Sequence, residues 1–435
     1  MVLIWPTGCQ RAPDSPERLD RQAPPPDAGQ ASTSPLAFPP REYPAHPPAS
    51  AKTIEALGLL LKTGSQSSSG DAKLRSRFEA LGETRLAPLL SFVEDPELSR
   101  PEKLLALLAL QWLPDRRSAP QLARLSLELP DPLLVAAAAD ALAATGDPRG
   151  VAALETLSRR PDPVLRRRAV MAIGALGAGG LAARTAARQA LRRLASHPDA
   201  RIRGAVMVQL GVLGAKDDCP WFLSALSDSD MLVRRRAAEG LARHADRLHL
   251  AALSGALKDP FGPVAVAAAR GLERLEDPAA LPALYAYLAG QERAALDPTL
   301  RALQAIGDAR AIPHVAPLLD DRDGYLRAAA AKTLGALGGV EAAGPLRRAL
   351  RGDMVIGRIA AAEALARLGK DAREALDELH RAAKDDPHPQ VRELARVAVR
   401  AIGEGVPRAE GAHEGTPPAL EKPPSSTAED EPAAP

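Results

Sequence analysis

The chain has 435 residues, and its 56 Lys and Arg residues nearly balance its 54 Asp and Glu residues, which leaves a formal charge of +2. Hydrophobic residues make up 46% of the chain but aromatic residues only 3%, which argues against a carbohydrate-binding groove, a base-stacking platform or an ordinary β-sandwich core. The two cysteines exclude a disulfide-rich scaffold, and no apolar run reaches the roughly 18 residues of a membrane span.

Residues 1–50 contain twelve of the 41 prolines and show no periodic apolar pattern. This composition predicts a disordered, Pro-rich segment that acts as a tether. At its start, Thr7-Gly8-Cys9 resembles the end of a bacterial lipoprotein signal peptide, whose cysteine is lipidated after cleavage, although Pro6 stands where leucine is usual. The resemblance makes Cys9 a candidate lipidation site at the cell envelope if the start site is truncated. The alternative is a cytoplasmic protein with a frayed N-terminus.

Residues 51–96 surround a Ser-rich loop at 64–70 and are predicted to form degenerate capping helices. They precede a repeated pattern that extends over residues 97–403. Each repeat has an Asp-rich turn and then a helix with a basic residue near its start and Leu-Gly or Ile-Gly near its end, as in Asp162–Gly177. We call Arg166 and the positions equivalent to it in the other repeats the anchors, whichever residue stands there. They recur at intervals of 28 to 37 residues, at Lys103, Val135, Arg166, Arg203, Arg234, Ala265, Thr299, Arg327, Arg358 and Arg392.

Each repeat is predicted to be a helical hairpin. Positions −1, +3, +6, +7 and +10 from each anchor are nearly always apolar or small, which indicates an amphipathic anchor helix. A second helix is predicted to follow each anchor helix, for example over 312–319. Because one hairpin cannot bury its apolar stripe alone, the hairpins must stack into a solenoid.

The ends of the anchor helices also carry signals. Asp accepts hydrogen bonds from free amides and Pro suits the first helical position, so four Asp-Pro pairs are predicted to open anchor helices, at 131–132, 162–163, 259–260 and 386–387. Five glycines are predicted to end anchor helices in the left-handed conformation: Gly146, Gly177, Gly214, Gly338 and Gly369.

The motif Asp-x-x-Val-Arg-x-x-Ala-x-x-Ala-Leu-Gly, best seen at 228–241, 323–335 and 386–403, resembles HEAT repeats, especially the short bacterial type named after phycobilin lyase subunits. The resemblance covers roughly residues 97–403. It implies an all-α fold, a right-handed α-solenoid of about ten HEAT-like hairpins. Ankyrin and tetratricopeptide repeats have a similar period, but the Thr-Pro-Leu-His turn of the former and the Trp and Tyr anchors of the latter are not found.

In HEAT repeats the matching arginine usually pairs with acidic turn residues of an adjacent repeat. The resemblance therefore implies a structural ladder of six anchors: Arg166, Arg203, Arg234, Arg327, Arg358 and Arg392. The guanidinium group of an arginine can donate two parallel hydrogen bonds to a carboxylate, which suits a structural contact at the same position of successive repeats. The alternative is that these arginines bind an anion.

No catalytic, cofactor-binding or metal-binding residues are predicted, and the chain is not expected to be an enzyme. The repeat region holds no P-loop, GxSxG, HExxH or GxGxxG motif. Deoxyhypusine hydroxylases resemble this architecture and hold a di-iron centre with repeated His-Glu pairs, but the only His-Glu pair here is His413-Glu414, near the C-terminus. Lyase activity follows only from the family name, and Cys219 is interpreted as a buried structural thiol.

Second helices usually line the concave face of HEAT solenoids, which is the usual partner face. In this chain they carry aromatic and basic residues that we predict to bind a partner: Trp221, Phe222, Tyr285, Tyr287, Arg192, Arg193, Arg347, Arg348 and Arg351. Tyr285 and Tyr287 cannot both lie on one helical face, so the alternative is that half of the aromatic side chains face the core.

Residues 404–435 contain seven prolines, seven acidic and two basic residues, which predicts a disordered acidic tail. Residues 51–403 then carry 50 basic and 42 acidic residues, a net charge of +8. The leading hypothesis is a non-catalytic scaffold that binds an unknown protein partner through its concave face. The alternatives are nucleic-acid binding in a basic groove, as in HEAT-like DNA glycosylases, and a lyase-type enzyme by fold analogy. No cofactor and no small-molecule substrate are expected.

Overall fold

The computed structural model describes residues 49–64, 71–214, 216–244, 246–290 and 292–404. Every regular element in these ranges is a helix, which confirms the all-α prediction. None of the described helices is both long and apolar enough to cross a membrane. The predictions of a disordered N-terminal segment, an acidic tail and a lipidated Cys9 concern residues that, apart from 49, 50 and 404, lie outside the described ranges.

Three helices precede the first anchor: α1 (Ala51–Gly64), α2 (Asp71–Glu79) and α3 (Leu86–Glu94). They lie where capping helices are predicted. Leu57 and Leu61 are four residues apart on one face of α1 and are fully buried, as is Phe78 of α2. The division of the chain at residue 97 stays a prediction.

The ten anchors lie in ten separate helices, each near the helix start. These anchor helices are α4 (Arg100–Trp112), α6 (Pro132–Ala144), α8 (Pro163–Leu176), α10 (Ala200–Leu213), α12 (Met231–His244), α14 (Gly262–Leu275), α16 (Leu296–Ile306), α18 (Gly324–Leu337), α20 (Val355–Leu368) and α22 (Pro389–Glu404). Between them lie the second helices α5 (Ala119–Glu128), α7 (Val151–Leu157), α9 (Leu181–Leu194), α11 (Cys219–Ala225), α13 (Leu250–Ala256), α15 (Leu281–Leu288), α17 (Ile312–Val315), α19 (Val340–Ala349) and α21 (Leu376–Asp385).

Short 3-10 turns lead into most second helices and into α3. They are η1 (Glu83–Arg85), η2 (Arg116–Ser118), η3 (Pro148–Gly150), η4 (Gly177–Gly179), η5 (Lys216–Asp218), η6 (Arg247–His249), η7 (Pro278–Ala280), η8 (Ala309–Ala311) and η10 (Gly369–Ala375). The second helix predicted over 312–319 is shorter than expected, because α17 ends at Val315 and continues as the 3-10 helix η9 (Ala316–Asp320). Pro317 has no amide to donate to the preceding turn, so the α-helical ladder stops there.

The core has the composition that the sequence predicts. In α8 the side chains at −1, +3, +6, +7 and +10 from the anchor are all buried: Leu165, Ala169, Ala172, Ile173 and Leu176. In α18 the same positions are again buried: Leu326, Ala330, Thr333, Leu334 and Leu337. The helices therefore pack through small and branched aliphatic side chains, which explains how the chain folds with so few aromatic residues.

Two of the four predicted helix starts are correct. Asp131 and Asp162 cap α6 and α8 by accepting hydrogen bonds from Leu133 N (2.8 Å) and Val164 N (2.7 Å). The starts predicted at 259–260 and 386–387 are wrong by two residues each. Asp259 accepts from Phe261 N, and α14 begins only at Gly262; Asp386 accepts from His388 N, and α22 begins at Pro389. At these two sites the aspartate closes a turn that precedes the helix.

Four of the five predicted helix-ending glycines have a positive φ: Gly146, Gly214, Gly338 and Gly369. The prediction is wrong for Gly177, whose φ is −60°, because the chain continues there into η4 and reverses at Gly180. Gly177 instead lies in a close contact with neighbouring helices. A Cβ atom at this position would lie 2.6 Å from Leu213 Cδ2 and 3.2 Å from Ala187 Cβ, so the Leu213 side chain would have to move to make room for it.

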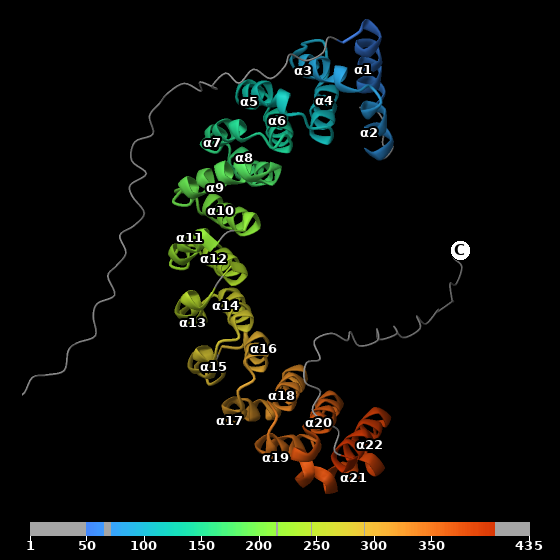
Figure 1. The fold of residues 1–435 in the computed structure, drawn as a ribbon, viewed down its shortest axis with the longest axis vertical. Coiled ribbons are helices and arrows are strands. Elements are labelled where there is room, and N and C mark those ends of the chain that lie inside the picture. The colour runs from blue at the N-terminus through green and yellow to red at the C-terminus, as the bar shows by residue number, and fades with distance from the viewer. Residues whose placement is uncertain (1–48, 65–70, 215, 245, 291, 405–435) are drawn as a thin grey trace, which may run out of the picture. The chain divides into compact units, whose positions relative to one another are not determined.

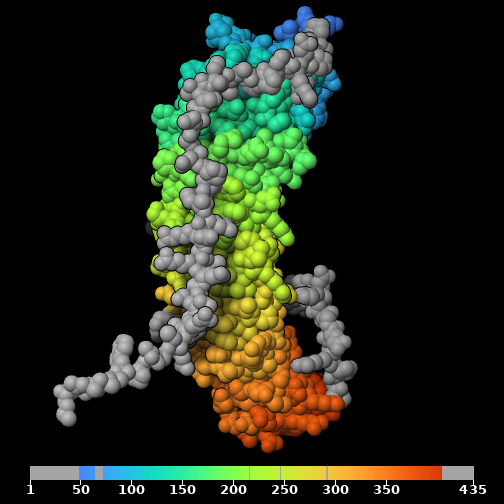
Figure 2. All heavy atoms as spheres, turned by 60° about the vertical axis from the view of Figure 1, so that its left-hand side comes forward, coloured from blue at the N-terminus to red at the C-terminus, as the bar shows by residue number. Residues whose placement is uncertain are grey.

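The described chain divides into two compact units, with the boundary between Gly240 and Leu241, inside α12. In each unit, taken by itself, the anchor helices form one layer and the second helices form another (Figure 1). Within each unit, neighbouring repeats are stacked in chain order, as the space-filling view shows (Figure 2). Successive anchor helices contact one another more extensively than successive second helices do.

In each unit the anchor helices lie on the inner side of the curved stack (Figure 1). This corrects the prediction that second helices line the concave face. Small residues allow the anchor helices to approach closely: a Cβ atom added to Gly335 of α18 would lie only 2.8 Å from Ala364 Cα of α20. A layer with closer helix spacing is shorter along the stack, so it forms the inner side of the curve.

A close contact between two glycines in the first unit gives a stability prediction. Gly146 has a φ of +60°, and a Cβ atom there would lie 2.5 Å from the backbone Cα of Gly179. We expect Gly146→Ala to lower the free energy of unfolding by about 2 kcal/mol or more, because backbone strain adds to a clash that no rotamer relieves. Chemical denaturation measures the change. The matched control is Gly255→Ala in α13, where nothing lies within 4 Å and a helical alanine should add up to about 1 kcal/mol; equal midpoints for the two variants would contradict the prediction.

Candidate functional site

The six predicted ladder arginines share one contact. Each donates from Nη1 to carbonyl oxygens of the turn that precedes its own helix, at positions −6 or −5 or both. Arg203, for example, donates to His197 O (2.9 Å) and Pro198 O (3.0 Å). The corresponding bonds are also made by Arg166, Arg234, Arg327, Arg358 and Arg392. The guanidinium group therefore fixes the turn against the first turn of the anchor helix.

Arg166, Arg203, Arg327 and Arg358 also reach an aspartate of the following repeat. In the first unit Arg203 binds Asp228 with two bonds of 2.7 Å, and Arg166 Nη2 lies 2.8 Å from Asp199 Oδ2. In the second unit Arg327 Nη2 lies 3.1 Å from Asp353 Oδ1. These are the contacts that the ladder hypothesis expects. The structural role of the six arginines stays a proposal, and a variant of Arg358 tests it.

The aspartates explain why the Asp-Arg pattern recurs in the repeats whose anchor is an arginine. Asp199 accepts from Arg201 N at the start of its own helix and from Arg166 of the preceding repeat. The hydrogen bond from Arg166 holds the pKa of Asp199 below its usual range. The bond from Arg203 likewise lowers the pKa of Asp228, against the effect of burial. One carboxylate thus caps a helix and links two repeats.

The structure places half of the predicted aromatic patch in the core. Phe222 is fully buried, and its ring occupies the space that the missing side chain of Gly240 leaves open, since a Cβ atom there would lie 2.4 Å from Phe222 Cε1. Tyr287 is 7% exposed, and its hydroxyl accepts from Ala295 N at 2.9 Å. Neither side chain is accessible to a partner. The prediction of these two residues as partner-binding is therefore wrong, and the alternative that half of the aromatic residues face the core is correct.

The other two aromatic residues are half-buried and already have neighbours. The Arg192 guanidinium lies 4.5 Å from the centre of the Trp221 ring in the first unit. In the second unit the Tyr285 ring stacks on His314, with centroids 3.9 Å apart. Burial is the main cause that raises the pKa of Tyr285. The two residues belong to different units.

Most of the predicted partner-binding arginines are engaged within their own unit. Arg192 donates to the fully buried carboxylate of Asp218 at 2.8 Å, and Arg193 binds Glu155 with two bonds of 2.8 Å. Arg351 pairs with Glu378, Arg347 donates to Glu374 O, and Arg348 is exposed. These contacts hold second helices to their neighbours, so the second-helix layer offers little unpaired charge at these positions.

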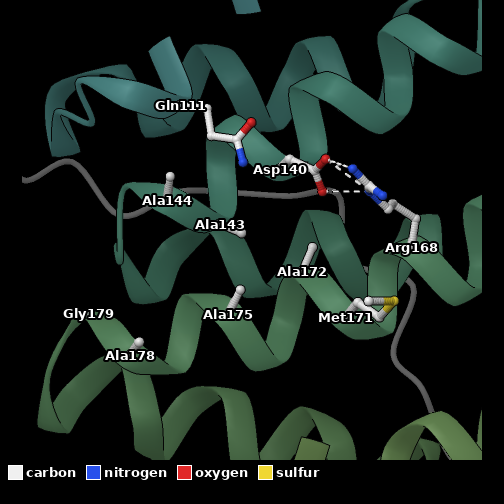
Figure 3. A pocket seen from close by; sticks show the side chains of 10 residues that line it. All are labelled: Gln111, Asp140, Ala143, Ala144, Arg168, Met171, Ala172, Ala175, Ala178 and Gly179. Atoms are coloured by element: carbon white, nitrogen blue, oxygen red, sulfur yellow. Dashed lines mark hydrogen bonds and ion pairs between the residues drawn. The ribbon is translucent and has the colours of Figure 1, made fainter. Parts of the chain in front are cut away.

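The anchor-helix layer of the first unit carries two hollows instead. The first has a volume of about 530 Å³ and lies between α4, α6 and α8. Its lining residues are Gln111, Asp140, Ala143, Ala144, Arg168, Met171, Ala172, Ala175, Ala178 and Gly179. Figure 3 shows Asp140 and Arg168 joined across two helices at one side of this hollow, with alanine side chains along the rest of it.

The second hollow adjoins the first, because Met171 lines both. It has a volume of about 430 Å³ and lies between α8, α10 and the first turns of α12. Its lining residues are Arg167, Met171, Ala200, Arg201, Gly204, Ala205, Val208, Gln209, Asp230, Leu232, Arg235 and Arg236. Two apolar side chains of this hollow are largely exposed, Met171 at 42% and Leu232 at 48%.

Charge in the second hollow is unbalanced. Arg167 and Arg201 are exposed and make no ion pair or side-chain hydrogen bond within the described chain. Arg235 and Arg236 share a single carboxylate, that of Glu239, at 3.5 and 3.0 Å. In the first hollow, by contrast, the one arginine, Arg168, is neutralised by Asp140. The second hollow is therefore the basic one.

Sequence reasoning missed these hollows, although the signal is present. Ala144 and Ala175 both lie at position +9 from their anchors, Ala205 lies at +2 and Gly204 at +1. Small residues on the exposed side of adjacent helices leave space between them. The arginines at +1 and +2 then form the edge of that space. These positions lie on anchor helices, whereas the sequence analysis predicts the partner-binding face on the second helices.

No group of three or more His, Cys, Asp or Glu side chains that could hold a metal ion occurs within the described ranges. Cys219 is 1% exposed and lies in the first turn of α11, in line with its interpretation as a structural thiol.

Stacked helical hairpins with Asp–Arg contacts between neighbouring repeats define an α-solenoid repeat protein. A family model of HEAT repeats matches residues 86–174, 155–230, 219–296 and 298–356. The chain therefore belongs to the HEAT-repeat family. This fold mostly serves non-catalytic interaction scaffolds.

Several solved structures show the same fold. Importin beta in an ammonium sulfate condition is 17% identical over 80% of this chain and 55% of that chain, with a TM-score of 0.52. The Kap95–Nup1 complex is 13% identical over 81% and 56%, with a TM-score of 0.60, and yeast importin beta (Kap95p) is 13% identical over 81% and 56%, with a TM-score of 0.57. The chain spans just over half the length of these proteins. The comparison with curated proteins finds no match.

Proposed function

We propose that this chain is a non-catalytic HEAT-repeat scaffold that binds a protein partner through the anchor-helix face of its first unit. The proposal depends on one observation: two adjoining hollows lie on the anchor-helix layer, and in the second of them the exposed side chains of Met171 and Leu232 lie beside Arg167 and Arg201, which have no ion pair within the described residues. Concave surfaces with a few apolar anchors and a polar edge are typical of protein-binding sites. The similar Kap95 solenoid, solved in complex with Nup1, supports a protein as the partner.

Nucleic-acid binding has less support from the same surface. Residues 51–403 carry a net charge of +8, but many arginines are engaged in ion pairs, among them Arg166, Arg203 and Arg358. The second hollow contains no aromatic side chain on which a base could stack. A location at the cell envelope depends on lipidation of Cys9, which metabolic labelling of the chain and of a Cys9→Ser variant with a radioactive fatty acid would test.

Site-specific photocrosslinking tests the proposed function. A photoreactive phenylalanine analogue replaces either Met171, which lines both hollows, or Leu181 of α9, which is 83% exposed on the second-helix layer of the same unit. In living cells we expect the full chain to form the same protein adduct reproducibly from position 171 and not from position 181. Identical adducts from both positions, or nucleic acid alone at position 171, would contradict the proposal.

A further inference from the structure

We infer that the second hollow binds an acidic segment of the partner, with carboxylates on Arg167 and Arg201 and apolar side chains on Met171 and Leu232. This inference rests on the proposed function and adds the chemistry of the partner. The occupant is an extended protein segment with an acidic residue at every third position and apolar residues between them.

The charge of the hollow selects a carboxylate. Four arginines and one aspartate, Asp230, line it. Asp230 is already engaged, because it caps α12 by accepting from Leu232 N (2.8 Å) and Val233 N (3.2 Å). Arg235 Nε is buried and makes no hydrogen bond, and its ion pair with Glu239 is long, at 3.5 Å. Guanidinium groups without partners bind carboxylates with two parallel hydrogen bonds, so this surface has unused binding capacity for an acidic ligand.

The spacing of the arginines fits an extended chain. Arg167 is on α8, Arg201 on α10, and Arg235 and Arg236 are on α12, three successive anchor helices of one unit. Packed helices lie about 8–10 Å apart. In a polyproline II segment every third residue lies on the same side, about 9 Å from the last. A segment with an acidic residue at every third position therefore presents one carboxylate to each helix.

The apolar part of the hollow favours a peptide over a nucleic acid. Met171 and Leu232 are about half exposed, and the floor between them is formed by small or aliphatic residues, Gly204, Ala205 and Val208. Covering such side chains is favourable by roughly 25 cal/mol per Å² of apolar surface. A sugar-phosphate backbone has few apolar groups to offer here. A peptide with leucine or similar side chains beside its acidic residues can contact both the arginines and the apolar side chains of the hollow.

Binding of a defined peptide tests the inference. The probe is a fluorescent peptide of four Glu-Leu-Ser repeats, whose affinity for the full chain is measured by fluorescence anisotropy at low salt. Peptides of four Gln-Leu-Ser or four Glu-Ser-Ser repeats remove the charge or the apolar side chains. We expect each comparison peptide to bind at least about tenfold more weakly, and the affinity of the Glu-Leu-Ser peptide to fall as salt rises.

A matched pair of variants locates the binding. Arg167→Glu/Arg201→Glu should weaken binding of the Glu-Leu-Ser peptide by at least about tenfold. Arg159→Glu/Arg184→Glu makes the same change of charge at two exposed arginines after α7 and on α9, which have no ion pair within the described residues and do not line the hollow. This control should change the affinity by less than about twofold. Equal losses in the two variants would show nonspecific attraction and overturn the inference.

Three other results would also overturn it. Equal affinity for the Gln-Leu-Ser peptide would show that carboxylates are not selected. Duplex DNA that binds at the same site, with no peptide binding, would assign the hollow to nucleic acid. Peptide binding that appears only after removal of residues 405–435 would make the chain's own acidic segment, rather than a partner, the occupant. A protein adduct at position 171 without peptide binding would leave the proposed function standing and reject only the acidic segment.

Discussion

Replacing Arg358 by alanine should destabilise the second unit by about 3 kcal/mol. Arg358 Nε and Nη2 lie 2.8 and 3.2 Å from the two oxygens of Asp386, and both side chains are nearly buried, at 10% and 6% exposure. Its Nη1 also bonds Gly352 O and Asp353 O. Removing one member of a buried pair leaves the other charge without its partner, which typically costs 3–5 kcal/mol. The loss should appear as faster hydrogen exchange in α20 and α22.

The pH dependence of this destabilisation shows whether it comes from loss of the ion pair or only from loss of packing. Burial acts to raise the pKa of Asp386, but the hydrogen bonds from Arg358 and from the His388 amide outweigh it and lower the pKa below its ordinary value of 3.8. A depressed carboxylate pKa stabilises the folded state above the unfolded pKa, and this contribution is lost as pH falls through the folded pKa. The difference between the native chain and Arg358→Ala should therefore be full at pH 7 and shrink below about pH 4.

Arg396 provides the control for this prediction. It also pairs with a carboxylate, Glu393, at 3.1 Å, but the two side chains are 55% and 58% exposed on the same helix, α22. Arg396→Ala should cost less than about 0.5 kcal/mol, because exposed pairs contribute little. If Arg358→Ala is as mild as Arg396→Ala, the arginine ladder has no structural role, and the anion-capture reading of the anchors gains support.

The repeat pattern was predictable because the same physical requirement returns about every 32 residues. Each hairpin must bury an apolar stripe against the next, so the stripe recurs at fixed offsets and the ten anchors fall in ten helices. An aspartate that caps one helix also binds the arginine of the preceding repeat. The sequence therefore contains an aspartate and an arginine at a fixed spacing. Both signals lie within one or two repeats of sequence.

The inner layer of the stack was not predictable in the same way. It depends on how closely helices of neighbouring repeats approach, which is set by contacts such as that of Gly335 with Ala364, 29 residues later. The hollows share this origin, since they require small residues on the exposed sides of two adjacent helices at once. The apolar pattern within one helix predicts which of its residues are buried. The shape of the exposed surface depends instead on the side chains of two adjacent helices.

Helical periodicity separates the two kinds of aromatic position only in part. Phe222 lies three residues after Cys219, and Tyr287 lies three residues after Leu284; all four side chains are buried. Trp221 and Tyr285 are out of phase with these pairs and are half-buried. Spacing of three or four residues marks one helix face, so the burial of Phe222 follows from the position of Cys219. Tyr285, however, also lies four residues after the buried Leu281, so spacing alone does not distinguish it from Tyr287.

Phe222→Ala should cost about 3–5 kcal/mol in the stability of the first unit. The ring is fully buried against α12, and the space above Gly240 cannot close when the ring is removed, because the helix backbone is fixed by its own hydrogen bonds. Trp221→Ala should cost less, about 1–2 kcal/mol, since the indole is half-exposed and loses mainly its contact with Arg192. Chemical denaturation measures both changes. If Phe222→Ala instead leaves stability unchanged and abolishes the adduct at position 171, the ring belongs to the partner surface rather than to the core.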